Sequence, residues 1–216
     1  LGLFQDSTLA TPAGEGDPVG GWQDQSGAGN HAIQVTQAKR PTLKRDPLTG
    51  RSLVWADGTD DGLSFANGAI PAGERTFLVV VTCRNTSGHI FSTGRGGATL
   101  GSFELRRDHI IIYDDAASAF NHTHNFGSGW RVESHVFRTT GSEHRKNGGS
   151  LFTTTRSATL STIQAGLFGR SLAANGSNMD FPLAGDIGEF IVYNRALTTT
   201  ERERVEVYLK DRWGTP

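Results

Sequence analysis

The sequence predicts an all-β protein, a sandwich of two antiparallel sheets with one C-terminal α-helix. Roughly a dozen short apolar runs, rich in β-branched and aromatic residues, follow one another along the chain. Turn-forming residues separate them, with 28 glycines against 7 prolines, which is typical of antiparallel strands joined by tight turns. Helical periodicity is convincing in one segment, residues 198–213. A barrel is the main alternative to the sandwich.

Composition limits the classes of partner. We expect one domain over residues 1–216, because all-β domains often reach this length and no linker interrupts the pattern. The formal net charge is −1 and basic residues are dispersed, which argues against nucleic acid as a partner. No apolar stretch approaches the ~20 residues that would predict membrane insertion. The single cysteine, Cys83, ends an apolar run and is expected to be buried, so no disulfide framework is predicted.

The strand candidates are short and end at turn residues. Residues 76–83 are apolar on both faces, which predicts a central strand covered on both sides. The run Asn147-Gly148-Gly149 predicts a hairpin, because these residues tolerate positive φ. In chain order, the candidates before the closing segment are 22, 31–34, 52–55, 62–65, 76–83, 89–92, 101–106, 109–113, 130–137, 143–146, 151–155 and 165–168.

The candidate strand 130–137 alternates between apolar and polar residues. Trp130, Val132 and Val136 share one face, which we expect to pack inward. The other face is expected to show charge, and with Glu104 and Arg106 it would line a concave sheet. Its residues are Arg131, Glu133 and His135.

The last strand and the helix form the closing unit, residues 185–214. Alternation fails between Ile187 and Phe190, which predicts a bulge near Gly188 that resets the face of each side chain. Thr198 and Glu201 fit a capping box, so the helix is expected to begin in the run 198–200. It should end at Gly214. The expected apolar face of the helix comprises Val205, Tyr208, Leu209 and Trp213.

Several strings occur in the order known from one fold family. They are WQDQSGAGNH at 22–31, ADGTDD at 56–61, IFSTG at 90–94, Trp130 followed by Asn147-Gly148, and the closing unit. From residue 22 to 214 the chain resembles concanavalin A-like, laminin-G-like domains of bacterial and phage proteins. It departs from them at Trp55-Ala56 and at residues 144–146, where His, Arg and Lys replace apolar residues. The resemblance implies a jelly-roll sandwich, but the family's members differ in function.

A ligand site is expected near the polar segment 120–126, FNHTHNF. Amides and imidazoles beside phenylalanine rings suit the hydroxyls and C–H faces of sugars. The alternatives are an ordinary polar loop and, for the strand 130–137, a solvated face. The expected ligand-binding residues are Asn121, His122, His124, Asn125, Arg131, Glu133 and His135.

Acidic residues raise two further possibilities. No cofactor is expected to be required. The resemblance implies a structural calcium ion where acidic turns meet, because Ca²⁺ prefers oxygen ligands. Building turns is the alternative role of these acids. Glycoside hydrolysis needs a carboxyl pair, and Asp186 with Glu189 is the nearest approach, without a third partner. The expected calcium ligands are Asp24, Asp60, Asp186 and Glu189, with Asp61 beside them.

These observations favour a non-catalytic, lectin-like surface or adhesion module that binds a glycan or a cell-surface polysaccharide. We expect it outside the cell or on a virion surface. The first alternative is a structural decoration or oligomerisation module whose partners are other subunits of a virion or surface assembly. The second is a divergent glycoside hydrolase.

Overall fold

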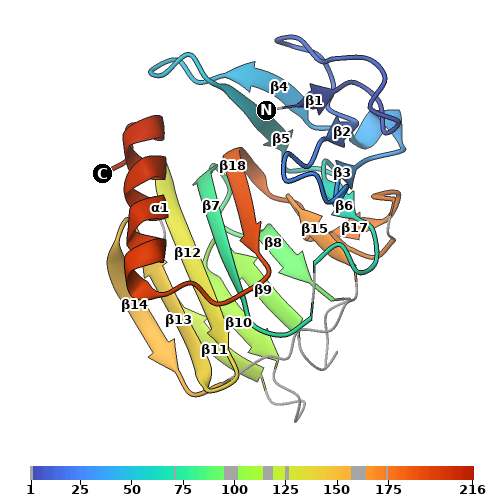
Figure 1. Ribbon diagram of the computed structural model, residues 1–216. Coiled ribbons are helices and arrows are strands. Elements are labelled where there is room, and N and C mark those ends of the chain that lie inside the picture. Colours follow the sequence, from blue (N-terminus) through green and yellow to red (C-terminus); the bar gives the residue numbers. More distant parts are fainter. Residues whose placement is uncertain are drawn as a thin grey trace.

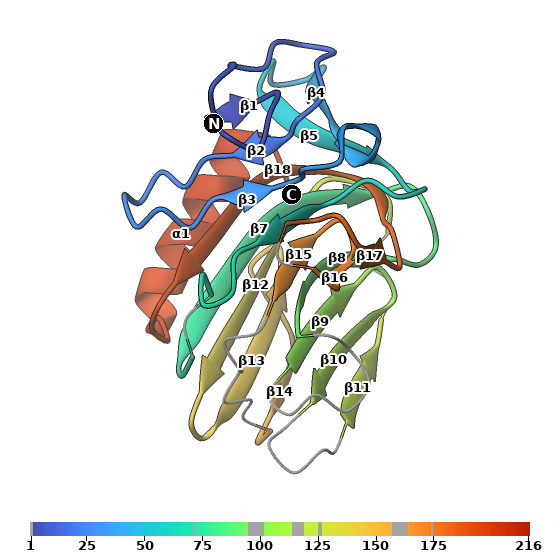
Figure 2. The same ribbon diagram turned by 90° about the vertical axis from the view of Figure 1, so that its right-hand side faces the viewer.

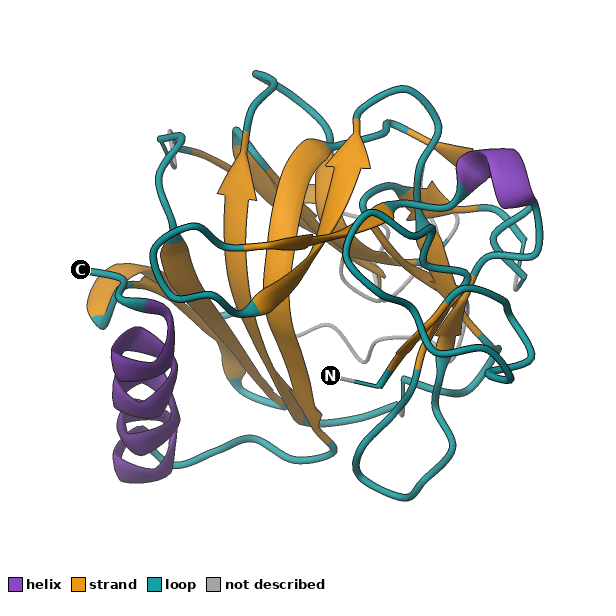
Figure 3. Cartoon of the chain, turned by 90° about the horizontal axis from the view of Figure 1, so that it is seen from above, coloured by secondary structure: helices purple, strands orange, loops and turns teal. Residues whose placement is uncertain are grey.

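The computed structural model describes residues 2–70, 72–94, 102–113, 119–124, 127–156, 164–173 and 175–216. Two large antiparallel sheets face each other, and the helix α1 (Thr199–Trp213) lies outside one of them, as Figure 1 and the view from above in Figure 3 show. The predicted all-β sandwich with one C-terminal α-helix is therefore confirmed. In the described part of the chain, no helix combines the length and apolar character that crossing a bilayer requires.

The first sheet has nine strands among the described residues. In spatial order they are β1 (Leu3–Phe4), β2 (Gly21–Trp22), β3 (Ala32–Ile33), β6 (Leu63–Phe65), β15 (Ala165–Leu167), β8 (His89–Thr93), β9 (Ser102–Arg106), β10 (His109–Tyr113) and β11 (Ala119–Thr123). A hairpin of β16 (Arg170–Ser171) and β17 (Met179–Asp180) forms a separate ribbon, and a short 3₁₀ helix covers Gln37–Lys39.

The second sheet carries the helix. Its strands are β14 (Gly149–Thr154), β13 (Gly141–Lys146), β12 (Arg131–Arg138), β7 (Arg75–Cys83), β18 (Ala184–Tyr193), β5 (Ser52–Asp57) and β4 (Thr42–Arg45). Figure 2 shows β12 to β14 facing β8 to β11, with the N-terminal strands gathered at one end of the molecule.

The central strand prediction is confirmed. β7 lies in the middle of the second sheet and every residue in it is buried. Phe77 and Val79 point into the core between the sheets, whereas Leu78 and Val80 belong to a second cluster beneath α1. A strand covered on both faces needs apolar side chains at consecutive positions, which explains its unbroken hydrophobic run.

The closing unit forms as predicted at its turns. The register of β18 against β7 shifts between Ile187 and Glu189, which leaves Gly188 as the bulge. The capping box of Thr198 and Glu201 is complete, and Gly214 ends the helix with a φ of 60°.

The predicted apolar face of the helix is partly wrong. Tyr208 is 48% exposed, whereas Arg202 and Glu206 are buried against the sheet. Arg202 Nη1 lies 2.6 Å from a carboxylate oxygen of Glu143 on β13, so an ion pair replaces an apolar contact at the start of the helix.

Strands that lack an apolar run were missed. The segment 119–123 was interpreted as part of a polar loop, but it is the edge strand β11, paired with β10 along its whole length. Its main-chain hydrogen bonds place it in the sheet whatever its side chains are. β1, β4, β16 and β17 were missed for the same reason, because two to four residues carry too little periodicity.

Candidate functional site

A cavity of about 590 Å³ lies between the closing strand β18 and the segment that joins β2 to β3. Its wall combines segments that are far apart in the sequence, since β2, β3, β6 and β15 belong to the first sheet and β18 to the second. The described lining residues are Trp22, Gln23, Asp24, Gln25, Ser26, Ala28, Asn30, Ala32, Phe65, Gly68, Ala69, Ile70, Leu167 and residues 189–194.

Part of the cavity wall is apolar and aromatic. Phe65 and Phe190 meet there with ring centroids 5.9 Å apart. Both belong to the core between the sheets, together with Ile70 and Leu167, so the walls are held by the main packing of the protein. Trp22 is partly buried against the same core and keeps part of its ring accessible.

The polar rim is held by Asp24. Its carboxylate accepts hydrogen bonds from the Ser26 amide at 2.8 Å, the Ser26 hydroxyl at 2.8 Å and the Asn30 amide at 3.0 Å. Burial raises the pKa of Asp24, but these hydrogen bonds outweigh it and hold the pKa below its ordinary value. The rim segment 23–31 is therefore ordered around one charged carboxylate.

The rim turn continues into the next strand. The Asp24 amide donates to His31 Nδ1 at 3.0 Å. Gly27 and Gly29 have φ of 86° and 77°, which favours glycine at both positions.

One wall of the cavity is an open sheet edge. β5 pairs with β18 only over residues 184–187, while β7 pairs with β18 on its other side as far as Tyr193. Among the described residues, no strand pairs with 189–193 on the cavity side. Main-chain N–H and C=O groups of an unpaired edge are available to a ligand.

The expected binding residues of segment 120–126 lie elsewhere. Asn121 is exposed on β11, while the His122 ring stacks on Phe152 of β14 with centroids 4.1 Å apart. His124 follows β11 and is partly buried, and burial lowers its pKa to about 4. Asn125 lies outside the described residues. None of the three described residues lines the cavity.

The prediction that strand 130–137 shows charge to solvent is wrong. Arg131, Glu133 and His135 are 1%, 0% and 0% exposed and point between the sheets, as Phe137 does. The opposite face of β12 is covered by α1, so neither face meets water. The sequence pattern shows which residues share a face, but not that both faces are covered. These three residues therefore do not belong to a surface on which a glycan could lie.

The predicted carboxylates of β18 share a face, but each has its own partners. Because of the bulge, Asp186 and Glu189 stand opposite Thr82 and Val80, on the outer face of the sheet. Arg84 Nη1 lies 2.7 Å from Asp186, and Glu189 accepts hydrogen bonds from Arg212 at 3.0 Å and Trp213 at 3.1 Å. Both carboxylates therefore have basic or N–H partners, and Asp24 accepts the hydrogen bonds of its own turn.

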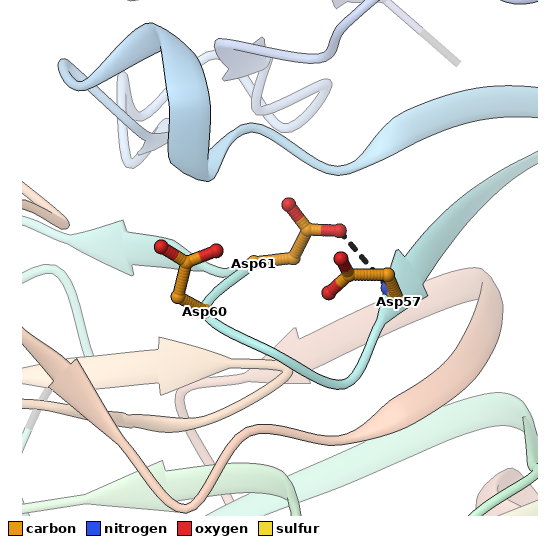
Figure 4. A group of neighbouring side chains, drawn as sticks. All are labelled: Asp57, Asp60 and Asp61. Carbon is orange, nitrogen blue, oxygen red and sulfur yellow. Dashed lines mark hydrogen bonds between the residues drawn. The ribbon is translucent and has the colours of Figure 1, made fainter.

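The predicted residue Asp60 belongs to a different acidic group. Oxygens of Asp57, Asp60 and Asp61 lie within 4.8 Å of one another around the turn between β5 and β6 (Figure 4). The Asp57 amide donates to Asp61 at 2.9 Å. Burial raises the pKa of Asp61 to about 6, and the charges of Asp57 and Asp60 act in the same direction. In the described part of the chain, this set of oxygen ligands fits Ca²⁺ better than the dispersed acids do.

The raised pKa of Asp61 predicts a pH dependence of stability. The carboxyl is harder to ionise in the folded chain, so its contribution is fully present below pH 4 and is lost as the pH rises through about 6. The contribution of Asp61 to the free energy of unfolding should fall by at most about 3 kcal/mol over this window, seen as the difference between wild type and a variant without this carboxyl. We expect Asp61→Asn to remove the loss, measured by urea unfolding in EDTA at pH 4 and pH 8.

Bound Ca²⁺ should offset the stability that is lost when the Asp61 carboxyl ionises. At pH 8, millimolar Ca²⁺ should raise the melting temperature of the wild-type protein and leave Asp61→Asn less affected. A melting temperature that Ca²⁺ leaves unchanged in both proteins would show that the three acids build only the turn. Equal pH dependence of wild type and variant would contradict the burial argument.

The cavity could not be found from the sequence alone. Trp22 and Asp24 stood out in the string 22–31, but they were interpreted as a core residue and a turn or calcium ligand. The available signal was the combination of that string with the bulge at Gly188, since the bulge is where β5 leaves β18.

The fold can now be compared with known proteins. No family model and no curated protein matches the chain in sequence. Domain 4 of AbnA, an extracellular arabinanase from Geobacillus stearothermophilus, in complex with arabinotriose, has a TM-score of 0.60 and 13% identity over 77% of this chain and 81% of that chain. The shared fold is a two-sheet antiparallel β-sandwich.

Two other structures share this fold as part of a longer chain. The binding domain of botulinum neurotoxin serotype G has a TM-score of 0.59 and 11% identity, and covers 87% of this chain and 48% of that one. Trypanosoma rangeli sialidase has a TM-score of 0.59 and 15% identity, and covers 92% of this chain and 31% of that one. At these identities the likeness shows the fold alone.

Proposed function

We propose that this protein is a lectin-like module that binds a glycan in the cavity between β18 and the segment 22–30. The observation that carries the proposal is the cavity itself, whose wall combines aromatic and apolar side chains with polar ones on a sheet scaffold. Support comes from a protein of similar fold, the arabinanase domain, whose structure holds arabinotriose.

Sugars offer two chemistries that this cavity matches. Their C–H faces pack on aromatic rings, and Trp22 presents such a ring at the cavity wall. Their hydroxyls both donate and accept, as do the amides of Gln23, Asn30 and Asn194 at the rim. Asn30 and Asn194 are exposed, so their side chains can turn toward a ligand.

Binding should depend on the cavity and not on β11. Asn30→Ala should weaken glycan binding several-fold, because the variant loses an amide from the rim while the main-chain bond to Asp24 remains. Trp22→Ala should weaken binding at least about tenfold through the lost stacking surface. The measurement is calorimetric titration with the best hit of a glycan array.

The exposed residue Asn121 on β11 offers the matched control, since Asn121→Ala removes the same amide from the site expected on sequence grounds. Equal affinity of Asn30→Ala and wild type, with a loss in Asn121→Ala, would move the site to β11. Circular dichroism should verify that Trp22→Ala folds, because Trp22 also packs on the core.

The proposal includes a non-catalytic role at an extracellular or virion surface. The nearest carboxylate pair, Asp186 and Glu189, is engaged by Arg84 and Arg212, which supports binding without hydrolysis. The laminin-G-like type and the surface location rest on the sequence strings alone. Hydrolysis of a bound glycan that is lost in Glu189→Gln would overturn the non-catalytic role.

A protein-binding role is the second candidate. Val207 and Tyr208, consecutive residues of α1, are 56% and 48% exposed. Such a patch favours an interface with another subunit. Light scattering after size-exclusion chromatography should then show a dimer that Val207→Lys dissociates.

A further inference from the structure

We propose that the cavity binds neutral glycans in preference to acidic ones. Most of the hydrogen bonds to the glycan hydroxyls come from the open main-chain edge of β18. This inference rests on the proposed function, and it adds the substrate class. Three features carry it: the charge of the lining, the state of the nearest basic side chain, and the edge that the bulge exposes.

The described part of the lining lacks basic side chains. Its described residues include two acids, Asp24 and Glu189, and no lysine, arginine or histidine. Asp24 is held in its charged form by the rim hydrogen bonds, so the mouth of the cavity carries a negative charge. Glu189 is on the same strand as the cavity wall, but its carboxylate is bound to Arg212 and Trp213.

The nearest basic side chain along the chain is already paired. Arg195 follows the lining residue Asn194, but its two terminal nitrogens each donate to Glu201 at 2.9 Å. That bidentate pair belongs to the start of α1 and already matches the guanidinium with a carboxylate. His31, next to the rim, uses Nδ1 to accept from the Asp24 amide.

Acidic sugars need a basic side chain, and the described lining residues include none. A carboxylate of a sialic or uronic acid is recognised by arginine or lysine, most strongly in bidentate geometry. Placing it beside Asp24 without a cation adds like-charge repulsion and desolvates a second carboxylate. A neutral sugar has neither cost.

The open edge supplies the complementary polar groups. Gly188 marks the point where β5 stops pairing with β18, and residues 189–193 line the cavity beyond it. Every second residue of this stretch directs its N–H and C=O to the open edge, while the residues between them pair with β7, and a hydroxyl can pair with either kind of group. Main-chain groups carry no net charge, which again matches an uncharged ligand.

An extended peptide could also pair with such an edge, as an added strand. The cavity favours a compact ligand instead, because side chains of the turn 22–30 and of residues 68–70 line it beside the edge, and its volume of about 590 Å³ lies in the range of small-molecule sites. The ligand of this cavity is therefore a saccharide and not a peptide strand.

The test uses the full chain and probes that differ in charge. Arabinotriose and lactose are the neutral probes, and 3′-sialyllactose and trigalacturonic acid are the acidic ones. We expect each acidic probe to bind at least about tenfold more weakly than the neutral ones, and neutral binding to be insensitive to NaCl from 50 to 500 mM. Amides of 189–194 should exchange hydrogen more slowly with the neutral ligand bound.

Adding a positive charge to the lining should weaken the preference against acidic sugars. Ala28 lines the cavity on the exposed turn, so Ala28→Arg should strengthen binding of the acidic probes about fivefold at low salt without improving neutral binding. Ala28→Gln is the matched control, of similar length and uncharged, and should do neither.

The outcomes separate the two proposals. Equal affinity for neutral and acidic probes would overturn the selectivity while leaving the glycan site in place. Unchanged exchange of amides 189–194 would overturn the role of the strand edge. If no sugar binds, the proposed function fails and this inference with it. If a blocked pentapeptide of alternating Thr and Val binds and none of the sugars does, the open edge of β18 serves to pair with an added peptide strand.

Discussion

Replacing Glu133 by Gln should destabilise the protein by about 3–5 kcal/mol, because it leaves the Arg131 guanidinium buried beside an uncharged partner. Both residues are sealed between the sheets, and Arg131 Nε lies 2.5 Å from the Glu133 carboxylate. Burial raises the pKa of Glu133, but Arg131 and His135 outweigh it and hold the pKa below its ordinary value. Urea unfolding at pH 7 measures the loss.

The matched control removes both charges. The double variant Arg131→Met, Glu133→Leu should recover most of the stability, because apolar residues of similar volume need no desolvation of ions. An additive loss in the double variant would contradict this account. If Glu133→Gln is as stable as wild type, the other contacts of Arg131, such as its hydrogen bond to Cys83 Sγ at 3.1 Å, are enough to stabilise the buried guanidinium.

The same network makes the protein less stable in acid. Because the folded-state pKa of Glu133 is depressed, its stabilisation is present above about pH 4.5 and lost as the pH falls through the folded value. His144 is also fully buried, 2.9 Å from His135 through their Nδ1 atoms, and burial lowers its pKa well below the ordinary value. Charging His144 below pH 6.5 therefore favours the unfolded chain.

The second large effect concerns the docking of α1 on the bulge. Trp213→Ala should cost about 3–5 kcal/mol, since the ring is 2% exposed and packs on Trp130 with centroids 5.3 Å apart. Gly188→Ala should cost about 1–3 kcal/mol by overpacking, because a Cβ at this position would lie 2.5 Å from Trp213 Cη2.

The two substitutions should not add. In the Trp213→Ala background the clash is gone, so Gly188→Ala should then cost less than in the wild type. Gly129→Ala is the control, because a Cβ there meets nothing within 4 Å, and it should change stability little. Strict additivity in the cycle, measured by urea unfolding, would show that the glycine serves the bulge geometry and not the tryptophan.

Elements that depend on neighbouring residues could be predicted from the sequence. The buried run of β7, the bulge at Gly188 and the capping box at Thr198 were each expected and each is present. Local signals suffice here because a bulge breaks side-chain alternation and a cap needs two residues three apart. The edge strand β11 lacked such a signal, since its pairing with β10 uses the main chain.

The position of the candidate site was not predictable in the same way. Asn121, His122 and His124 have suitable chemistry, but they lie on or directly after the edge strand β11, and none of them lines the cavity. Arg131, Glu133 and His135 were correctly placed on one face of a strand, and that face proved to be the inside of the sandwich.

By itself, the sequence determined the fold class, the order of most strands and the chemistry of the closing unit, because periodicity, turns and caps act over a few residues. Only the tertiary structure decided which faces are covered and where a cavity opens. α1 covers the outer face of β12, and the cavity arises because β5 leaves β18 at Gly188 just where the turn after Trp22 approaches from the other sheet. These contacts join residues far apart in the sequence, and side-chain packing in three dimensions selects them.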